Sequence, residues 1–306
     1  MIGSTSNLST ESIRADDTEL FFYEIASCAA NLPPRMPPTS WSGHIPFLYL
    51  LFRLQSPRLF VELGVQNGAS FIAACDAARR QRLSCRLVGI DTWQGDANTG
   101  YYEGDKMLEE LSSYITNQFA GAELVRSTFA EARPAIAPFS IDLLHIDGLH
   151  SYEAVREDFE TWRDAISERG VVLFHDTYVR ERGFGVARFW NELKRAHRTI
   201  EFNHGYGLGV LFFGKELPRP LERFVQLMES NNDFACLTRS LYEEMGNNLP
   251  QRLFDREQGG AYPAWTEFKA ESLAEITKLR EENRVMKQQL ESYEVLISEI
   301  RRGRSG

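Results

Sequence analysis

Residues 141–177 read IDLLHIDGLHSYEAVREDFETWRDAISERGVVLFHDT, and this stretch decides the fold. Two short apolar runs, at 141–147 and 171–174, flank a stretch at 152–169 that has helical patterning. A strand, a helix and a second strand make the unit of a parallel sheet, because parallel strands need a long crossover connection. The stretch therefore predicts a parallel sheet with a helix packed on one of its faces.

The same alternation continues in both directions along the chain. Because the strand-like runs are almost continuously apolar, we expect burial on both faces of the sheet. We predict an α/β fold with a mostly parallel sheet, helices on both faces and one antiparallel pair at an edge, formed by 199–203 and 207–214. The other predicted strands are Leu59–Leu63, Leu87–Asp91 and Leu124–Arg126, and the other predicted helices are 16–30, 45–54 and 70–82.

The tail has a heptad pattern that differs from the rest of the chain. Asn283 occupies one inner position, and a buried Asn there is a device that fixes the register of two-stranded coiled coils. We predict a coiled coil at 266–302 that makes the chain a dimer; a lone amphipathic helix packed on its own domain is the alternative. The inner positions are Ile276, Asn283, Leu290 and Ile297, with Leu279, Met286, Tyr293 and Ile300 between them.

Four segments follow from these patterns. Residues 1–40 are an N-terminal arm and helix that end in a proline-rich break, and 41–215 are the α/β domain. A helical extension at 216–265 precedes the coiled coil at 266–302.

Composition limits the class of protein and its partners. The chain has 306 residues, and its 34 basic against 43 acidic residues give a net charge of −9, which argues against nucleic acid as a partner. No apolar run reaches the length of a membrane helix, and the start of the chain lacks the pattern of a signal peptide. We expect a cytoplasmic protein with reduced thiols and no zinc, because no two cysteines form a CxxC pair; they are Cys28, Cys75, Cys85 and Cys236.

Glycines and acids at the ends of the first two strands predict a nucleoside site. Gly64 and Gly68 stand in a strand-to-helix turn that lets the backbone approach a ligand, and Asp91 is placed to accept hydrogen bonds from ribose hydroxyls. The glycine spacing departs from GxGxxG, which favours a ligand with an aminoacyl end over a dinucleotide. The candidate cofactor-binding residues are Glu62, Gly64, Asn67, Gly68, Ser70, Asp91 and Trp93.

A second cluster stands at the ends of the later strands. Asp147 and Asp176 converge if their strands are neighbours, and carboxylate oxygens suit Mg²⁺ or Mn²⁺ better than zinc. His150 lies just beyond, where an imidazole can act as a general base at neutral pH. Other interpretations stay open: His145 as a packed core residue, Asp147 as a helix cap, and His150 as part of a turn.

The motifs VELGV (61–65), GID (89–91), LHIDGLHSYEAVREDFETW (144–162) and GVVLFHD (170–176) resemble those of class I S-adenosylmethionine-dependent methyltransferases. The likeness covers about 41–214 and is closest to the macrocin and mycinamicin type of sugar O-methyltransferase. It implies a Rossmann-like sheet of seven strands, bound S-adenosylmethionine and a divalent cation. By this resemblance Glu62, Gly64 and Asp91 contact the methyl donor.

The resemblance also assigns the second cluster. It implies that Asp147 and Asp176 hold Mg²⁺ and that His150 takes the proton of the substrate. The relatives usually have an acid where this chain has His175, which makes His175 either a ligand of a softer metal such as Mn²⁺ or a neighbour of the ligands.

We therefore expect an O-methyltransferase that depends on S-adenosylmethionine and a divalent metal and acts on a hydroxyl of a sugar or glycan. A flap at 96–106, with Trp93, Tyr101 and Tyr102, is expected over the site, and Trp41 and His44 are expected on its other side. The alternatives are a metal-dependent sugar-nucleotide transferase and a non-catalytic oligomerisation module of the same fold. An iron oxygenase that uses His145, Asp147 and His175 is a further alternative.

Overall fold

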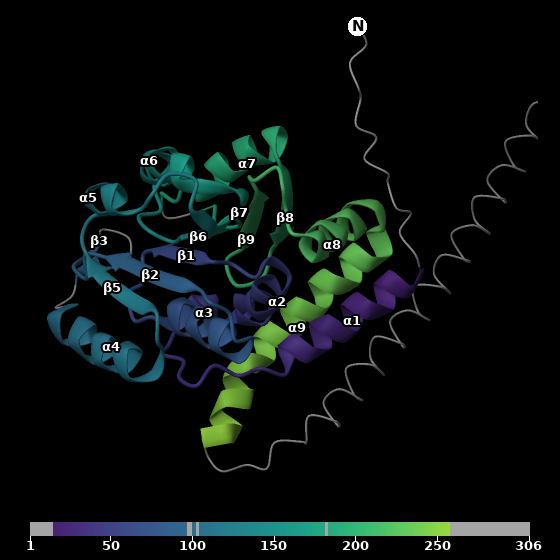
Figure 1. Cartoon of the computed structure of the whole chain (residues 1–306), viewed down its shortest axis with the longest axis horizontal. Coiled ribbons are helices and arrows are strands. Elements are labelled where there is room, and N and C mark those ends of the chain that lie inside the picture. The colour runs from purple at the N-terminus through teal and green to yellow at the C-terminus, as the bar shows by residue number, and fades with distance from the viewer. Residues whose placement is uncertain (1–14, 97–99, 102–103, 181–182, 258–306) are drawn as a thin grey trace, which may run out of the picture.

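The structure is a computed structural model that describes residues 15–96, 100–101, 104–180 and 183–257. Seven strands form one sheet in the order β5-β2-β1-β6-β7-β9-β8 (Figure 1). The predicted α/β fold with a mostly parallel seven-stranded sheet is thereby confirmed. The strands are β1 Leu59–Leu63, β2 Arg86–Asp91, β5 Ala122–Arg126, β6 Ile141–Ile146, β7 Ile166–His175, β8 Arg198–Phe202 and β9 Leu208–Phe212.

β9 is the strand that breaks the parallel pattern. It pairs antiparallel with β8, as predicted, and also with β7, because it lies between these two strands. The sheet therefore has two antiparallel pairs where the sequence led us to expect one. The turn from β8 to β9 has positive φ angles at Gly205, Tyr206 and Gly207, and this tight path returns the chain beside β7.

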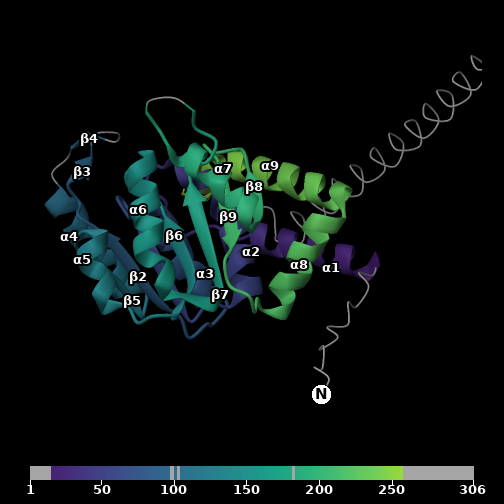
Figure 2. The ribbon, with the colours of Figure 1, turned by 90° about the horizontal axis from the view of Figure 1, so that it is seen from above.

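Helices cover both faces of the sheet (Figures 1 and 2). One face carries α5 Phe129–Ala132, α6 Tyr152–Trp162 and α7 Val186–Ala196. The opposite face carries α2 Ile45–Gln55, α3 Ala69–Arg80 and α4 Gly104–Gln118, and beyond α2 lie α1 Ala15–Ala29, α8 Arg219–Ser230 and α9 Asn232–Glu257. A short hairpin, β3 Gly95–Asp96 and β4 Gly100–Tyr101, precedes α4 within the segment predicted as a flap.

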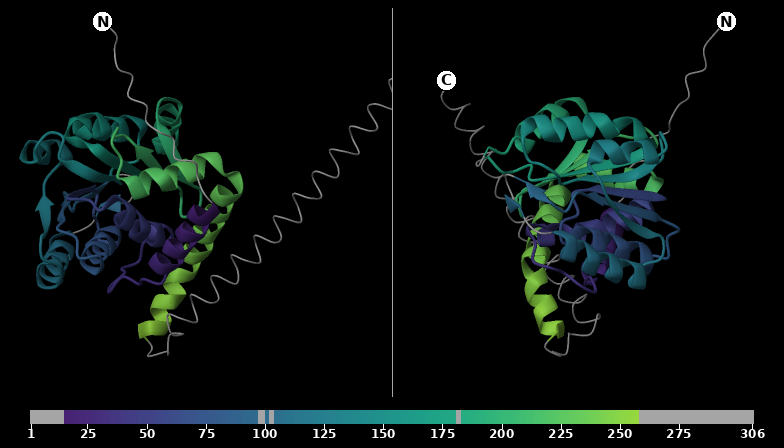
Figure 3. Two further views of the ribbon diagram at one scale, coloured as in Figure 1. Left: turned by 45° about the vertical axis from the view of Figure 1, so that its right-hand side comes forward. Right: turned by 90° about the vertical axis from the view of Figure 1, so that its left-hand side faces the viewer.

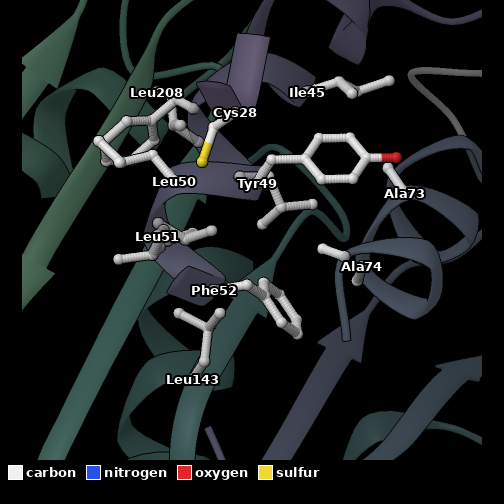
Figure 4. Close-up of a cluster of buried hydrophobic side chains, with 14 of the residues drawn as sticks. Cys28, Ile45, Tyr49, Leu50, Leu51, Phe52, Ala73, Ala74, Leu143 and Leu208 are labelled. Carbon is white, nitrogen blue, oxygen red and sulfur yellow. The ribbon is translucent and has the colours of Figure 1, made fainter. Parts of the chain in front are cut away.

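The side chains of each strand alternate between two apolar clusters, one on each face. In β1, Phe60 belongs to the cluster shared with α2 and α3, whereas Val61 and Leu63 belong to the cluster shared with α6 and α7. All residues of α2 except Arg53 are buried, as expected for a helix that is apolar on every side. Figure 4 shows part of the first cluster, with Tyr49 and other side chains of α2 close to those of α3.

The C-terminal helices pack on the same core as the sheet domain. α1, α8 and α9 lie side by side at one end of the molecule (Figure 3), and their apolar side chains join those of α2. α9 also packs on η1, a 3-10 helix at Ser40–His44. The contact needs glycine, because a Cβ on Gly246 would lie 2.3 Å from the carbonyl oxygen of Gly43.

Some element boundaries differ from those expected. The predicted helix at 152–169 ends at Trp162, because β7 already begins at Ile166, which pairs with Ile141 of β6. The polar residues Ser167, Glu168 and Arg169 hid this part of the strand in the sequence.

Two other predictions have different outcomes. The sequence did not predict α4, and the predicted coiled coil at 266–302 lies outside the described residues. Within the described ranges no helix is long and apolar enough to cross a membrane.

Candidate functional site

A cavity of about 680 Å³ opens at the carboxyl ends of the parallel strands. Its wall includes the turn after β1, the end of β2, and the segments that follow β5, β6 and β7. This is the edge at which open α/β sheets bind ligands. The arrangement brings residues from five strands to one opening.

The turn after β1 is held against the end of β6. Gly64 has φ +93°, and a Cβ there would lie 2.0 Å from the carbonyl oxygen of Asp147, so no other residue fits without displacement. The backbone N–H of Asp147 donates to the carbonyl of Leu63 (2.9 Å). Gly68, also at positive φ (+84°), is the N-cap residue directly before α3. The glycines therefore place the N-terminus of α3 and the start of the β6 loop at the same opening.

The carboxylate of Asp91 closes this turn from β2. Its Oδ2 accepts hydrogen bonds from the backbone N–H groups of Val65 and Gln66, both at 2.8 Å, and its Oδ1 accepts one from Trp93 (2.7 Å). Asp91 lines the cavity and has an acceptor position left on Oδ1, since a carboxylate oxygen can accept two hydrogen bonds. One residue thus shapes the turn and faces the cavity.

Two acids and two histidines meet where β6 and β7 end. Nε2 of His150 donates to Oδ2 of Asp176 (2.8 Å) and lies 3.7 Å from Oδ1 of Asp147. Nδ1 of His175 lies 3.3 Å from Oδ1 of Asp147 and 3.5 Å from Oδ2 of Asp176. We call these four residues the rim cluster. All four line the cavity, and the convergence expected of Asp147 and Asp176 is observed.

A backbone carbonyl sets the orientation of His175. Its Nε2 donates to the carbonyl oxygen of Gly205 (3.0 Å), in the turn between β8 and β9. Burial lowers the pKa of His175, but Asp147 and Asp176 outweigh it and hold this pKa well above its usual range, so Nδ1 carries a proton between the two carboxylates in the metal-free protein. Once that proton is lost, the proton on Nε2 leaves the lone pair of Nδ1 for a cation. This is how metal-binding histidines are commonly fixed.

The charges of the rim cluster shift its pKa values strongly. Burial opposes ionisation of Asp147, but His175 and His150 outweigh it and hold the pKa of Asp147 well below its usual range. The pKa of Asp176 is lowered in the same way, by hydrogen bonds from both histidines. Burial lowers the pKa of His150, yet its hydrogen bonds to Asp147 and Asp176 raise it to about 9. The rim cluster alone therefore keeps His150 protonated at neutral pH.

Three of the four residues fit a divalent cation. Asp147, His175 and Asp176 each offer a ligand atom, and these atoms lie within 4.8 Å of one another. Two carboxylate oxygens and one imidazole nitrogen suit Mn²⁺, and two carboxylates with water suit Mg²⁺. The two low carboxylate pKa values mean that both acids are ionised and ready to bind a cation at neutral pH.

The ring of His150 is fixed from its other side by Phe184. The two rings stack with centroids 4.5 Å apart and an angle of 17°. The N–H of Gly185 donates to the carbonyl of His150 (2.7 Å), and Ser151 caps α6 through its side chain. The backbone of His150 is thus fixed by a distant segment, while its side chain faces the cavity.

A buried chain of hydrogen-bonding groups crosses behind the site. Nε1 of Trp41 donates to Nε2 of His145 (3.1 Å), whose Nδ1 lies 3.2 Å from Oε2 of Glu62. Ser70 donates to the other oxygen of Glu62 (2.8 Å). Because both nitrogens of His145 are engaged here, the set of His145, Asp147 and His175 required by the iron oxygenase alternative is not assembled.

Five of the six histidines gather around this region. His44 donates through Nε2 to the carbonyl of Gly205 (3.0 Å), and its ring lies 4.8 Å from that of His204 and 5.6 Å from that of His175. Burial, followed by His175 and His204, holds the pKa of His44 well below its usual range. His44 is therefore a neutral packing partner of the rim cluster, and Trp41 beside it lines the cavity.

The structure separates the predicted site residues into two groups. Glu62, Gly68 and Trp93 are absent from the cavity wall. Trp93 is fully buried and donates through Nε1 to the carbonyl of Gln66, so its ring supports the turn from behind. The predicted residues that line the cavity are Gly64, Asn67, Ser70, Asp91, Asp147, His150, His175 and Asp176.

Several residues of the wall were not found from the sequence. Phe129 and Asp158 lie on the side of β5 and α6, and Phe184 and Tyr206 lie near the rim cluster. Phe129 follows a predicted strand, which was the available signal. Asp158 sits inside a helix full of acids, where nothing in the sequence distinguishes it.

Comparison with known proteins agrees with this geometry. Residues 61–177, from β1 to the residue after Asp176, match a family described as a methyltransferase domain. The matched range contains the glycine turn, Asp91 and the whole rim cluster. The match agrees with the resemblance to methyltransferases that the motifs of this part of the sequence indicated.

One curated relative and several solved structures are similar. An uncharacterized protein, y4gI, of Sinorhizobium fredii is 41% identical over 185 residues, which are 60% of this chain and 20% of that protein. The chain thus spans about a fifth of the length of this relative.

The solved structures are more distant. The O-methyltransferase TomG of Streptomyces achromogenes, involved in tomaymycin synthesis, is 18% identical with a TM-score of 0.43, over 67% of this chain and 93% of that chain. An O-methyltransferase of Bacillus cereus is 16% identical with a TM-score of 0.43, over 66% and 93%. A putative caffeoyl-CoA O-methyltransferase of Staphylococcus aureus is 14% identical with a TM-score of 0.43, over 65% and 92%.

Proposed function

We propose that this chain is an S-adenosylmethionine-dependent O-methyltransferase that also requires a divalent metal and acts on a hydroxyl of a sugar or glycan. One observation carries the proposal. The glycine turn with Asp91, suited to a nucleoside, and the rim cluster, suited to a metal and a base, open into the same cavity.

The methyl donor would lie over the turn after β1. Gly64 and the first residues of α3 offer close backbone approach and free N–H groups, and Asp91 offers an acceptor for a ribose hydroxyl. The match of 61–177 to a methyltransferase domain supports this placement. The sulfonium end would then face the rim cluster, because β6 lies next to β1 on the side away from β2.

Asp147, His175 and Asp176 would hold the metal. When bound, a divalent cation supplies positive charge that lowers the pKa of a nearby hydroxyl and offsets the two carboxylates. His175 is held for this role by Gly205, and Asp176 adopts a positive φ (+60°) that turns its side chain toward His150.

His150 would take the proton of the acceptor hydroxyl at Nε2. In the metal-free protein this nitrogen donates to Asp176, so it would first lose that proton when a cation offsets the charge of the two acids. Oxygen then forms a bond to the methyl carbon as the bond from carbon to sulfur breaks, and the thioether leaves. Stacking on Phe184 fixes the ring during this step. With the carboxylates uncompensated the pKa of His150 is about 9, so the imidazole becomes a base near pH 7 once their charge is offset.

Exposed apolar side chains near the opening support a sugar acceptor. Tyr206 lines the cavity and is 57% exposed, and its carbonyl accepts a hydrogen bond from the N–H of Tyr178, which is 54% exposed. Leu149, next to His150, is 40% exposed. The rings of Tyr178 and Tyr206 present flat apolar faces of the kind on which sugar rings pack.

The test is a methyl-transfer assay with labelled S-adenosylmethionine, run on a panel of monosaccharide, oligosaccharide and catechol acceptors, with Mg²⁺, Mn²⁺ or EDTA. We expect transfer to a carbohydrate hydroxyl that EDTA abolishes. Transfer that EDTA leaves intact would contradict the metal requirement, and transfer to catechols alone would contradict the sugar acceptor. Binding of a nucleotide sugar that is tighter than that of S-adenosylmethionine would favour the sugar-nucleotide transferase.

We also propose that the heptad segment 266–302 makes the chain a dimer. Light scattering on the full chain and on a version that ends at residue 262 tests this. The full chain should have twice the mass expected for one copy, and the shortened chain should be a monomer. If the full chain and the shortened chain contain the same number of copies per particle, the tail does not cause dimerisation.

A further inference from the structure

Two acids in the cavity wall, Glu157 and Asp158, have no role in the proposed reaction, and Asp158 is the more buried of the two. Asp158 lies on α6, on the side of the cavity formed by residues 128–130 after β5 and by Gly148 after β6. In the sheet order, β5 and β7 lie on opposite sides of β1. Residues 128–130 therefore mark the side of the cavity that lies away from His175 and Asp176.

The side chains of Asp158 and Phe129 both lie next to the Cα of Gly148. A Cβ placed on Gly148 would lie 2.5 Å from Cε2 of Phe129 and 3.2 Å from Oδ2 of Asp158. Glycine at 148 thus leaves room where an aromatic edge and a carboxylate oxygen converge. Ala130 and Ala154 also line the cavity, so small apolar side chains lie in the wall beside this aromatic ring.

Asp158 differs from the three other acids of the cavity that are partly or fully buried in having no partner among the described residues; Glu157, the fifth acid of the wall, is exposed. Asp91 accepts three backbone hydrogen bonds, and Asp147 and Asp176 face two histidines. Among the described residues, no hydrogen bond or ion pair reaches the carboxyl group of Asp158. Burial, followed by the charge of Glu157, raises its pKa to about 7. A partly buried, unpaired carboxyl is unfavourable, and in a ligand cavity it marks a group that a ligand completes.

The strand order indicates which part of the ligand reaches this group. If S-adenosylmethionine is the donor, its methyl must face the rim cluster on β6 and β7, and its ribose must lie near Asp91 on β2. The base then extends to the next strand, β5, where residues 128–130 begin. A flat heterocycle fits an aromatic ring and small residues, and its amine is a neutral donor suited to an apolar wall.

We infer that Asp158 accepts a hydrogen bond from the 6-amino group of the adenine of the methyl donor, with the base against Phe129. This inference rests on the proposed function and adds to it a residue that selects the base. The carboxylate recognises the donor amine and disfavours a 6-oxo base, whose oxygen would face a second acceptor.

Calorimetry with two thioethers tests the inference without an acceptor. S-adenosylhomocysteine carries the 6-amino group, and S-inosylhomocysteine carries an oxygen in its place. The native chain should bind the adenosyl compound at least about tenfold more tightly, the size expected for a hydrogen bond to a charged group. Asp158→Asn should bring the two affinities to within about threefold, because an amide can donate to the 6-oxo group.

Glu157→Gln is the matched control. Glu157 also lines the cavity but is exposed, so this change removes the same charge from the same part of the wall and should leave the preference of the native chain unchanged. Asp158→Asn is isosteric and removes an unpaired charge, so it should fold, which circular dichroism verifies.

The outcomes separate the two proposals. If the native chain binds neither compound, the proposed function fails and the inference with it. If it binds both equally, or if Asp158→Asn keeps the native preference, only the inference is overturned. A loss of preference in Glu157→Gln equal to that in Asp158→Asn would also overturn it, because the cause would then be general charge.

Discussion

The indole of Trp41 donates a hydrogen bond through Nε1 to Nε2 of His145 at 3.1 Å, and this bond joins η1 to the centre of the sheet. Since Nε2 accepts, the proton of a neutral His145 is on Nδ1, which faces the buried carboxylate of Glu62. One indole therefore determines the tautomer of a histidine that lies two residues before Asp147.

Replacing Trp41 by Phe tests the value of this bond. The change keeps an aromatic ring but leaves Nε2 of His145 without its donor, so the free energy of unfolding should fall by about 1–3 kcal/mol beyond the packing loss. Trp190→Phe is the control, because Trp190 is as buried and its Nε1 has no partner among the described residues. Urea unfolding of both variants gives the comparison, and equal losses would show that the bond contributes little.

Replacing His150 by Ala should lower kcat for methyl transfer about 10²- to 10⁴-fold, the usual contribution of a general base. The affinity for S-adenosylhomocysteine should change little, because the histidine faces the acceptor side. His197→Ala serves as the control, since His197 is exposed and its ring lies beside that of Phe213, away from the rim cluster. A rate close to that of the native chain would remove His150 from the mechanism.

The raised pKa of His150 also predicts how the stability of the metal-free protein depends on pH. The folded pKa of about 9 exceeds the unfolded value near 6.5, so protonation stabilises the fold below pH 6.5, and this stabilisation is lost as pH rises to 9. A difference of about 2.5 pKa units corresponds to at most about 3.4 kcal/mol. Thermal melts in EDTA between pH 6 and 9 should show the decline, and His150→Gln should make it shallower. A pH dependence equal to that of the native chain would contradict the assignment.

The metal preference should follow the residue at 175. Imidazole favours Mn²⁺ over Mg²⁺ more than a carboxylate does, so His175→Asp should shift the ratio of the two affinities toward Mg²⁺ by about tenfold or more. Paramagnetic resonance of free Mn²⁺, with Mg²⁺ as competitor, measures both affinities. His44→Gln controls for a general disturbance, since His44 packs on His175 outside the set of ligand atoms. An unchanged ratio in His175→Asp would place His175 outside the ligands.

Asp158 should destabilise the empty protein as it ionises. Its folded pKa of about 7 lies above the unfolded value near 3.9, so the folded state holds a proton more tightly and stability falls as pH rises from 4 to 7. Asp158→Asn removes this loss. Its melting temperature should therefore exceed that of the native chain by a few degrees at pH 7.5 and converge with it near pH 4. A constant difference across this range would argue against the raised pKa.

The strands and the rim cluster were predictable because their signals are local. A mostly apolar run followed by an acid, as at Ile146-Asp147 or His175-Asp176, indicates a buried strand. It also indicates that the acid lies at the carboxyl end of that strand. Neighbouring parallel strands then bring such acids together without any knowledge of distant contacts.

Other features depended on contacts between distant segments. Trp93 is an aromatic residue in a loop, which suggested a ligand contact, yet the turn it supports buries its ring completely. Ser167 and Arg169 look helical in the sequence, but Ser167 donates to Asp142, and the carbonyl of Arg169 accepts from Gln55. The insertion of β9 beside β7 likewise depends on a turn that only the folded chain displays.

The close contact of Gly246 with Gly43 has a consequence for any attempt to transplant the catalytic unit. The matched methyltransferase segment stops at residue 177, but the surface behind Trp41 is supplied by α9, more than fifty residues further along. A graft limited to the matched segment would lose one wall of its own cavity. The smallest portable unit therefore extends from η1 through α9.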